Sequence, residues 1–332
     1  MPKNSSISSS KTPPRAFLAA LGTFLAINLL VQAAFQSGYL KDQDDYLKRR
    51  AEYGAHEAAP VLLIGDSTVR MVQTPDLESE LKLREGDVLA ASFGGAVPRT
   101  LRWYFESTEY RNTAENSLCV LFVTPMQLNY HNRLFERTLD AAFAPRAAFT
   151  ELLLGGRWAN LRYYLLEDFL PIRRYRNQFK TALKEKMTGS SVPQAGIDPL
   201  KASSAPATEE EMQHWLSVYQ KESLGPAYRL DPYQLASLRE IVSRLADKKV
   251  RLVFVVPPLS PGVIQLTGDE ALGGFLTALR TLADEYKAPL FDYSRENKGY
   301  KFQDAVHLVL SSRKDFSARL CAELKKRISS AS

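Results

Sequence analysis

Five short aliphatic runs alternate with segments of helical periodicity, and this alternation limits the possible folds more than any other feature of the chain. The runs that we predict as strands are 61–64, 88–92, 118–124, 250–256 and 289–293. The helical patterns lie at 69–84, 98–112, 232–247 and 270–286. Because buried parallel strands read as continuous aliphatic runs, this order favours an α/β fold with a doubly wound, flavodoxin-like sheet of about five parallel strands and right-handed crossovers.

The first predicted strand ends in a turn that presents a serine. Gly65, Asp66 and Ser67 follow the aliphatic run, and the next segment, 69–84, has the pattern of an amphipathic helix. Backbone N–H groups at a helix start have no acceptor within the helix, so they can face an anion that forms beside the serine hydroxyl. Ser67 is therefore predicted as a nucleophile and, through its backbone N–H, as an oxyanion donor.

A second polar motif lies near the end of the chain, where Asp304 and His307 are three residues apart. A serine hydroxyl needs a base within hydrogen-bond reach, and that base needs a partner that fixes its tautomer. Within one short loop the Asp304 carboxylate can accept a hydrogen bond from Nδ1 of His307, which leaves Nε2 to face Ser67. The interpretation is a triad of Ser67, His307 and Asp304.

All candidate residues fall at the carboxyl ends of predicted strands, the edge where open α/β sheets bind their ligands. In strand order they are Ser67, Gly94, Gln127 with Asn129, and Asp304 with His307. Ordinary turn residues would not need to share one edge. This coincidence favours an enzyme over a binding protein.

Gly65-Asp66-Ser67 near the start and Asp304-x-x-His307 near the end resemble the SGNH/GDSL hydrolases and acyltransferases. The resemblance covers 59–128 and 231–328, and it is strongest to the membrane-anchored extracytoplasmic branch that includes alginate O-acetylation and teichoic acid D-alanine transfer proteins. It implies the SGNH fold and acyl transfer or ester hydrolysis through an acyl-serine.

The same resemblance implies oxyanion donors after the second and third strands. Gly94 fits the second-strand glycine, with Gly95 as the alternative. The usual Gly-x-Asn after the third strand is absent, and Gln127 or Asn129 is expected to donate from a shifted position. Removing one such donor typically lowers the rate by about 10² to 10³.

The N-terminal region predicts a membrane anchor. No charged residue occurs from 16 to 40, and cations without acids precede this stretch in the leader 1–15. A helix of this length can cross a bilayer, and the charge asymmetry keeps its N-terminus cytoplasmic. The alternatives are a signal peptide cleaved near Val31-Gln32-Ala33 and a buried core helix. Residues 41–58 are expected to form a stalk that holds an extracytoplasmic domain, in the periplasm or at the cell surface.

The remaining chain is expected to form one α/β domain in two parts, 59–128 and 231–328. Between them lies an insertion, 129–230, whose first part has an apolar helical pattern and whose stretch 188–210 has the Ser-, Ala- and Pro-rich composition of a mobile loop. Because it leaves the sheet directly after the third strand, the insertion should overhang the pocket and select the acyl acceptor. A cap without a role in substrate binding is the alternative.

Charge and cysteine content argue against a nucleic-acid-binding protein and against a metal-binding or disulfide-rich protein. The net charge of +6 is scattered along the chain, and no basic-aromatic module is present, so nucleic acid is not an expected partner. Cys119 and Cys321 lack metal-ligand spacing and allow one disulfide at most. No metal and no cofactor is expected.

The function predicted from the sequence is acyl ester chemistry on an extracytoplasmic polysaccharide or glycolipid. O-acetyl transfer is preferred over O-deacetylation because the anchored branch implies it, and that branch also implies a multi-pass membrane acyltransferase as partner. Two alternatives stay open. One is a catalytically degenerate domain that binds glycan or scaffolds a membrane complex, and the other is an anchored flavodoxin-like protein whose Gly-Asp-Ser turn binds an anion.

Overall fold

The computed structural model describes residues 15–36, 52–56, 58–132 and 203–329. They belong to two compact units, each described by itself: helix α1 (Arg15–Gln36) lies in one, and the sheet with its helices in the other.

Helix α1 overlaps the stretch predicted as an anchor, 16–40. It contains 22 residues and ends at Gln36, while 37–40 and the leader up to 14 lie outside the described residues. Among the helices that the structure describes, none is both long and apolar enough to cross a bilayer.

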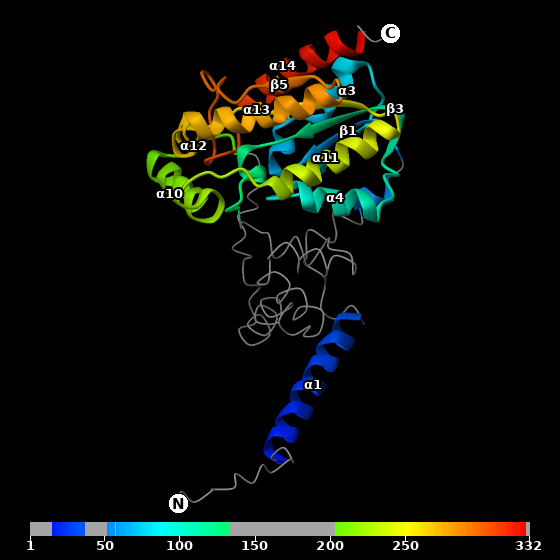
Figure 1. The fold of residues 1–332 in the computed structure, drawn as a ribbon, viewed down its shortest axis with the longest axis vertical. Helices are drawn as coiled ribbons and strands as arrows, with labels where there is room; N and C mark the ends of the chain where they lie inside the picture. Colours follow the sequence, from blue (N-terminus) through cyan, green and yellow to red (C-terminus); the bar gives the residue numbers. More distant parts are fainter. Residues whose placement is uncertain (1–14, 37–51, 57, 133–202, 330–332) are drawn as a thin grey trace, which may run out of the picture. The chain divides into compact units, whose positions relative to one another are not determined.

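The second unit is built on a parallel sheet of five strands in the order β2-β1-β3-β4-β5 (Figure 1). The strands are β1 (Ala59–Gly65), β2 (Val88–Ser92), β3 (Thr113–Phe122), β4 (Arg251–Val256) and β5 (Leu290–Asp292). Every neighbouring pair is parallel. The predicted doubly wound α/β sheet is confirmed, with β1 in its interior.

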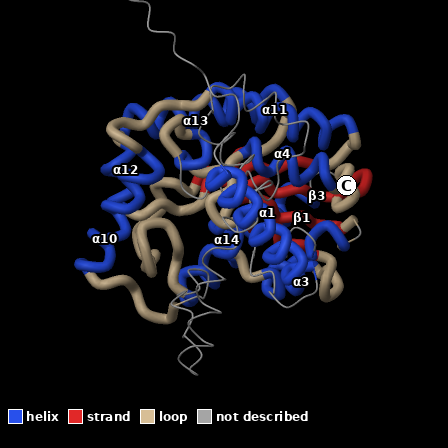
Figure 2. Tube along the Cα trace, turned by 90° about the horizontal axis from the view of Figure 1, so that it is seen from below, coloured by secondary structure: helices blue, strands red, loops and turns tan. Residues whose placement is uncertain are grey.

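Helices cover both faces of the sheet (Figure 2). One face carries α3 (Thr74–Leu81) and α14 (Leu310–Ser329), and the other carries α4 (Pro98–Ser107), α11 (Pro232–Asp247) and α13 (Asp269–Glu285). On the α14 side, Phe316, Leu320 and Leu324 pack with the strand residues Leu63 and Val120 in one buried cluster. Each such side chain contributes about 1.5–3 kcal/mol when fully buried, so α14 is held firmly against the sheet.

The helix predicted over 69–84 is broken in two. A 3₁₀ turn, η1 (Ser67–Met71), comes directly after the serine, and α3 begins only at Thr74. Val72 and Gln73 between them are extended. Pro75 explains the break, because it has no N–H to donate to the preceding helical turn and is tolerated only in the first turn of a helix, where α3 places it.

The predicted stalk, 41–58, is described only from 52 onward, and that part packs on the α/β domain. The Tyr53 ring meets Phe93 edge-on, with centroids 5.3 Å apart. Asn112 Nδ2 donates to the carbonyl oxygens of Tyr53 and His56 at 2.7 and 2.8 Å. Residues 52–56 are therefore part of the domain and not of a spacer.

Most of the predicted insertion, 133–202, lies outside the described residues. Its end contains α10 (Glu209–Tyr219) and a π turn, η3 (Gln220–Leu224). From Ser203 on, the predicted mobile loop 188–210 is hydrogen-bonded to the region of the predicted base: Leu310 N–H donates to Ser203 O, and Ala207 N–H to Phe302 O, both at 2.9 Å. These backbone bonds place the segment against the C-terminal part of the domain.

The two cysteines form no bond with each other. Cys119 lies in β3 and Cys321 in α14, and both are buried, free thiols. The single disulfide that the sequence allowed is absent.

Gly65 is expected to be intolerant of a side chain. A Cβ at this position would lie 2.8 Å from both Cβ and the carbonyl oxygen of Phe122 on the neighbouring strand. We predict that Gly65→Ala lowers the free energy of unfolding by about 1–3 kcal/mol, the usual cost of overpacking a core, in urea denaturation. Gly273→Ala in α13, where a Cβ meets nothing within 4 Å, is the control and should be neutral or stabilising. Equal effects of the two substitutions would contradict this account.

Candidate active site

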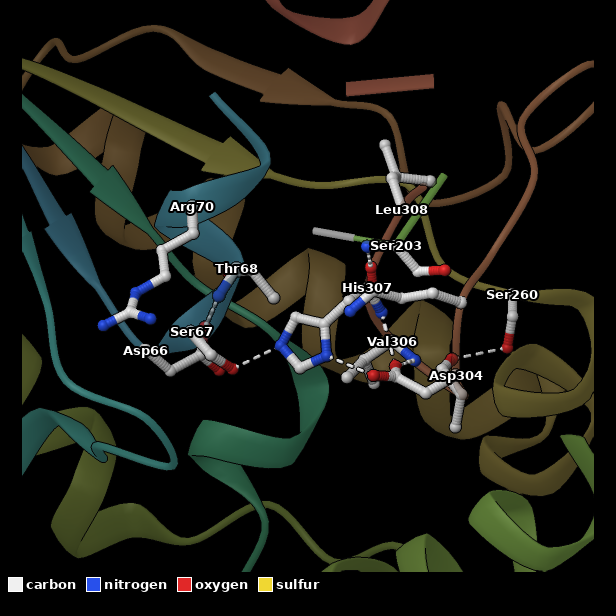
Figure 3. A network of polar contacts seen from close by, with 12 residues as sticks. Asp66, Ser67, Thr68, Arg70, Ser203, Ser260, Asp304, Val306, His307 and Leu308 are labelled. Carbon is white, nitrogen blue, oxygen red and sulfur yellow. Dashed lines mark hydrogen bonds and ion pairs between the residues drawn. The ribbon is translucent and has the colours of Figure 1, made fainter. Parts of the chain in front are cut away.

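The structure brings the three predicted triad residues into one hydrogen-bonded relay (Figure 3). His307 Nε2 lies 2.7 Å from Ser67 Oγ, although the two residues are 240 positions apart. His307 Nδ1 lies 2.7 Å from Asp304 Oδ2. Ser67 and His307 are 7% and 8% exposed, so the relay is largely shielded from solvent. The contact predicted between the two ends of the domain is present.

Asp304 is held as a carboxylate by the loop it shares with the histidine. Its Oδ1 accepts hydrogen bonds from the backbone N–H groups of Val306 and His307, at 2.8 and 2.7 Å. Burial opposes its negative charge, but attraction to His307 and these hydrogen bonds together lower the pKa of the Asp304 carboxyl below its usual range. An ionised Asp304 orients the imidazole and stabilises the imidazolium that forms when His307 takes a proton.

The turn that carries Ser67 is fixed by the neighbouring Asp66. Asp66 caps η1 by accepting from Thr68 N–H at 2.9 Å and from Thr68 Oγ1 at 2.6 Å. Thr124, after β3, donates to its other oxygen at 3.3 Å, and Ser92 Oγ, at the end of β2, donates to its carbonyl at 3.0 Å. Complete burial raises the pKa of the Asp66 carboxyl. These contacts connect the ends of three strands, and they assign Asp66 to holding the turn.

The two predicted backbone donors lie in two turns, one after β1 and one after β2. Ser67 is the first residue of η1, so its N–H has no acceptor in a preceding helical turn. Gly94 lies in the turn after β2, which a hydrogen bond from Phe93 N–H to Gly65 O ties to the end of β1 at 3.2 Å. Gly95, the alternative, has a φ of +72°, which glycine adopts without strain. That conformation accounts for the second glycine without an oxyanion role.

Gln127 and Asn129, the two candidates to replace the missing asparagine as oxyanion donor, have different hydrogen-bond partners in the structure. Asn129 Nδ2 donates to the carbonyls of Ser223 and Leu224 at 2.6 and 3.0 Å, and its oxygen accepts from Arg229 N–H at 2.9 Å. This side chain is fully used in holding the chain, so the prediction that it donates to an oxyanion is not supported.

The Gln127 amide lies beside the nucleophile turn, close to the Asp66 carboxyl. Its oxygen accepts from Thr124 N–H at 3.3 Å. Burial raises the pKa of Asp66, and the nearby Gln127 side chain opposes that change. The Gln127 nitrogen is buried without the backbone acceptors that engage the Asn129 nitrogen, and this favours Gln127 over Asn129.

Ser260 supports the base from the loop that follows β4. Its hydroxyl donates to the carbonyl of Ala305, inside the Asp304–His307 loop, at 2.7 Å (Figure 3). The same oxygen accepts from Val263 N–H at 3.3 Å and caps helix α12 (Pro261–Thr267). A serine directly before a proline-initiated helix is a capping signal, but its contact with residue 305 depends on the fold.

Among the described residues, no group of three or more His, Cys, Asp or Glu side chains is placed to hold a metal ion. The described site offers a hydroxyl, an imidazole and a carboxylate, from Ser67, His307 and Asp304. Together these groups can activate a serine for attack on a carbonyl carbon.

No family model matches this chain, and no curated protein matches its sequence. Solved structures similar to it include an acetyl xylan esterase, AlAXEase, at 12% identity and a TM-score of 0.39, covering 79% of this chain and 98% of that one. A GDSL-like lipase from Bacteroides thetaiotaomicron VPI-5482 is 12% identical with a TM-score of 0.41, covering 87% and 99%. A putative acylhydrolase from Bacteroides fragilis NCTC 9343 is 11% identical with a TM-score of 0.39, covering 85% and 97%. At these levels of similarity, the functional assignment rests on the geometry of the site.

The two amides should respond differently to substitution. We predict that Gln127→Met lowers kcat on an acetyl ester by about 10² to 10³, the usual effect of losing one oxyanion donor, and also lowers the free energy of unfolding by about 1–3 kcal/mol, because the buried Thr124 N–H loses its acceptor. Asn129→Ala should lower the free energy of unfolding, because it leaves buried backbone groups without partners at about 1–3 kcal/mol each, while kcat is retained. Steady-state kinetics and urea denaturation of both variants measure these effects. Unchanged kcat in Gln127→Met would remove Gln127 from the site.

Proposed function

We propose that this protein carries out serine-dependent acyl ester chemistry through a covalent acyl intermediate on Ser67. The observation that carries the proposal is the continuous relay from Asp304 through His307 to Ser67, with 2.7 Å at each step. Such a relay supplies a nucleophile, a base within proton-transfer distance and a group that orients the base.

In the proposed reaction, Ser67 Oγ attacks the carbonyl carbon of an ester while His307 Nε2 takes the hydroxyl proton. The negative charge that develops on the carbonyl oxygen is stabilised by the backbone N–H groups of Ser67 and Gly94 and by the Gln127 amide. Collapse of the tetrahedral intermediate breaks the ester C–O bond. His307 then returns its proton to the leaving alkoxide, and the acyl group remains on Ser67.

The second half of the reaction depends on the acceptor. Water activated by His307 releases a carboxylic acid, so the protein acts as an esterase, whereas a sugar hydroxyl in the same place yields a new ester. We propose O-acetyl transfer to a glycan hydroxyl as the preferred outcome, on the basis of the resemblance of the two sequence motifs to glycan-modifying acyltransferases. A multi-pass membrane acyltransferase as donor partner, and an extracytoplasmic location, stay predictions from the same resemblance.

Turnover of a chromogenic acetyl ester by the full-length protein tests the acyl-serine. We predict that Ser67→Ala and His307→Ala each lower kcat/KM by at least about 10³, because members of such a relay act as a unit. His131→Ala, which alters a histidine outside the relay, is the matched control and should retain wild-type turnover. Equal turnover in the wild type, Ser67→Ala and His307→Ala would eliminate the proposed mechanism. No turnover in any of them would favour the degenerate glycan-binding alternative.

Transfer and hydrolysis can be separated in the same assay. We predict that an oligosaccharide acceptor added to the acetyl donor yields an acetylated sugar, detected by its mass, because the acceptor competes with water for one acyl-enzyme. The yield should fall to background in Ser67→Ala. Release of acetate alone at saturating acceptor, across a panel of envelope oligosaccharides, would identify the protein as an esterase.

A further inference from the structure

The two halves of the relay are joined by a second contact on the side of helix α14. Arg313 lies in the first turn of α14 and is 5% exposed. Its Nε donates to the carbonyl of Leu308 at 2.8 Å, and its Nη1 donates to the carbonyl of Arg70 at 3.1 Å. Leu308 directly follows the base, and Arg70 belongs to the turn that begins with Ser67. One guanidinium therefore bridges the backbone of the nucleophile turn and the backbone of the base loop.

Figure 3 labels Arg70 and Leu308 on the two segments that carry Ser67 and His307. The Arg70 carbonyl lies near the end of η1, where a helix leaves carbonyls without internal partners. A guanidinium donates from a planar, rigid fork, so it fixes the separation of two acceptors better than a flexible ammonium does. The bridge thus sets a distance between two segments far apart in sequence.

Neighbouring side chains hold the guanidinium in place. Its Nη2 reaches Gln303 Oε1 at 3.4 Å, and the same oxygen accepts from Ser203 N–H at 2.8 Å. Burial lowers the pKa of Arg313, while attraction to the nearby Asp304 carboxylate opposes that change. An arginine remains protonated under these conditions, so the bridge persists across the working pH range of a serine–histidine pair.

A second side chain on the same face of α14 reinforces the attachment. Ser317, one turn after Arg313, accepts from Gln73 N–H at 2.9 Å, within the extended break that follows η1. Helix α14 is itself fixed to the sheet by its buried Phe316 and Leu320. The nucleophile turn is therefore anchored to a rigid helix, and Arg313 extends that anchor to the base loop.

We propose that Arg313 is a positioning residue that keeps Ser67 Oγ within hydrogen-bond distance of His307 Nε2. This inference rests on the proposed acyl-serine chemistry for its catalytic consequence, but the geometry it describes can be measured without any substrate. Arg313 does not touch the reacting atoms. It acts through the backbones of Leu308 and Arg70.

Kinetics of the full-length protein distinguish positioning from a general contribution to stability. We predict that Arg313→Met lowers kcat on the acetyl ester by about 10²-fold, the usual effect of displacing reacting groups by about 1 Å, with KM within about twofold. Arg313→Lys should recover only part of this loss, because an ammonium keeps the charge without the fork. Leu324→Val, which removes one methylene from the buried face of α14, is the control and should lower the melting temperature while kcat stays within about twofold.

An NMR measurement tests, independently of activity, whether Arg313 maintains the hydrogen bond between Ser67 and His307. The chain has four histidines, so the imidazole ¹⁵N signal of His307 can be assigned in histidine-labelled protein by its loss in His307→Gln. We predict that the Nε2 signal in Arg313→Met moves toward its position in Ser67→Ala, where the hydrogen bond to the serine is absent. In Leu324→Val the signal should stay at the wild-type position.

These measurements distinguish a failure of the Arg313 proposal from a failure of the proposed function. An Nε2 signal in Arg313→Met that coincides with the wild type overturns the proposal, as does a loss of kcat that follows the melting temperature in the same way as in Leu324→Val. If the wild-type protein hydrolyses no ester, the proposed function fails. The displaced or unchanged Nε2 signal then still decides whether Arg313 positions the pair.

Discussion

The contact between Ser67 Oγ and His307 Nε2 is the interaction on which the rest of this structure converges. It joins residues 240 positions apart at 2.7 Å, and the chain reaches it through the geometry of a parallel sheet. Parallel strands bring all their carboxyl ends to one edge. With β1 in the interior of the sheet and the base loop after β5, the last strand in the order, the loop has to return across that edge to reach the serine. Backbone bonds, the Ser260 hydroxyl and the Arg313 guanidinium hold it there.

Two aspartates in the site show how surroundings assign different roles to the same side chain. Asp66 is completely buried, and the desolvation of its carboxyl outweighs the hydrogen bonds that Thr68 donates, so its pKa is raised. Asp304 is partly buried, and the adjacent imidazole and two backbone N–H groups overcome its desolvation, so its pKa is lowered. Asp304 is thus suited to balance an imidazolium. Asp66 is suited to connect the turns at the ends of β1 and β3.

The sequence predicts the sheet well, because buried parallel strands are continuous aliphatic runs that need no knowledge of their neighbours. The strand Val88–Ser92 and the helix Pro232–Asp247 have the predicted bounds. Pro75 carries a readable signal for the break after η1, which the periodicity of 69–84 concealed.

The site could be predicted only in part for a related reason. Ser67, Asp304 and His307 follow from residue chemistry together with strand order. The sequence could not distinguish Gln127 from Asn129 as the donor. That distinction depends on which amide the segment 223–229 engages, about 95 residues further along the chain. Arg313 carries no signal in the sequence, since its partners are backbone carbonyls and any residue type supplies a carbonyl.

Covalent labelling tests the central claim most directly. A serine-reactive phosphonate added to the full-length protein, followed by peptide mass mapping, reports whether the hydroxyl at position 67 is activated in solution. We expect one label, on the peptide that contains Ser67, with a labelling rate that falls by orders of magnitude in His307→Ala. A label on another serine, or equal labelling in the wild type and His307→Ala, would contradict the account.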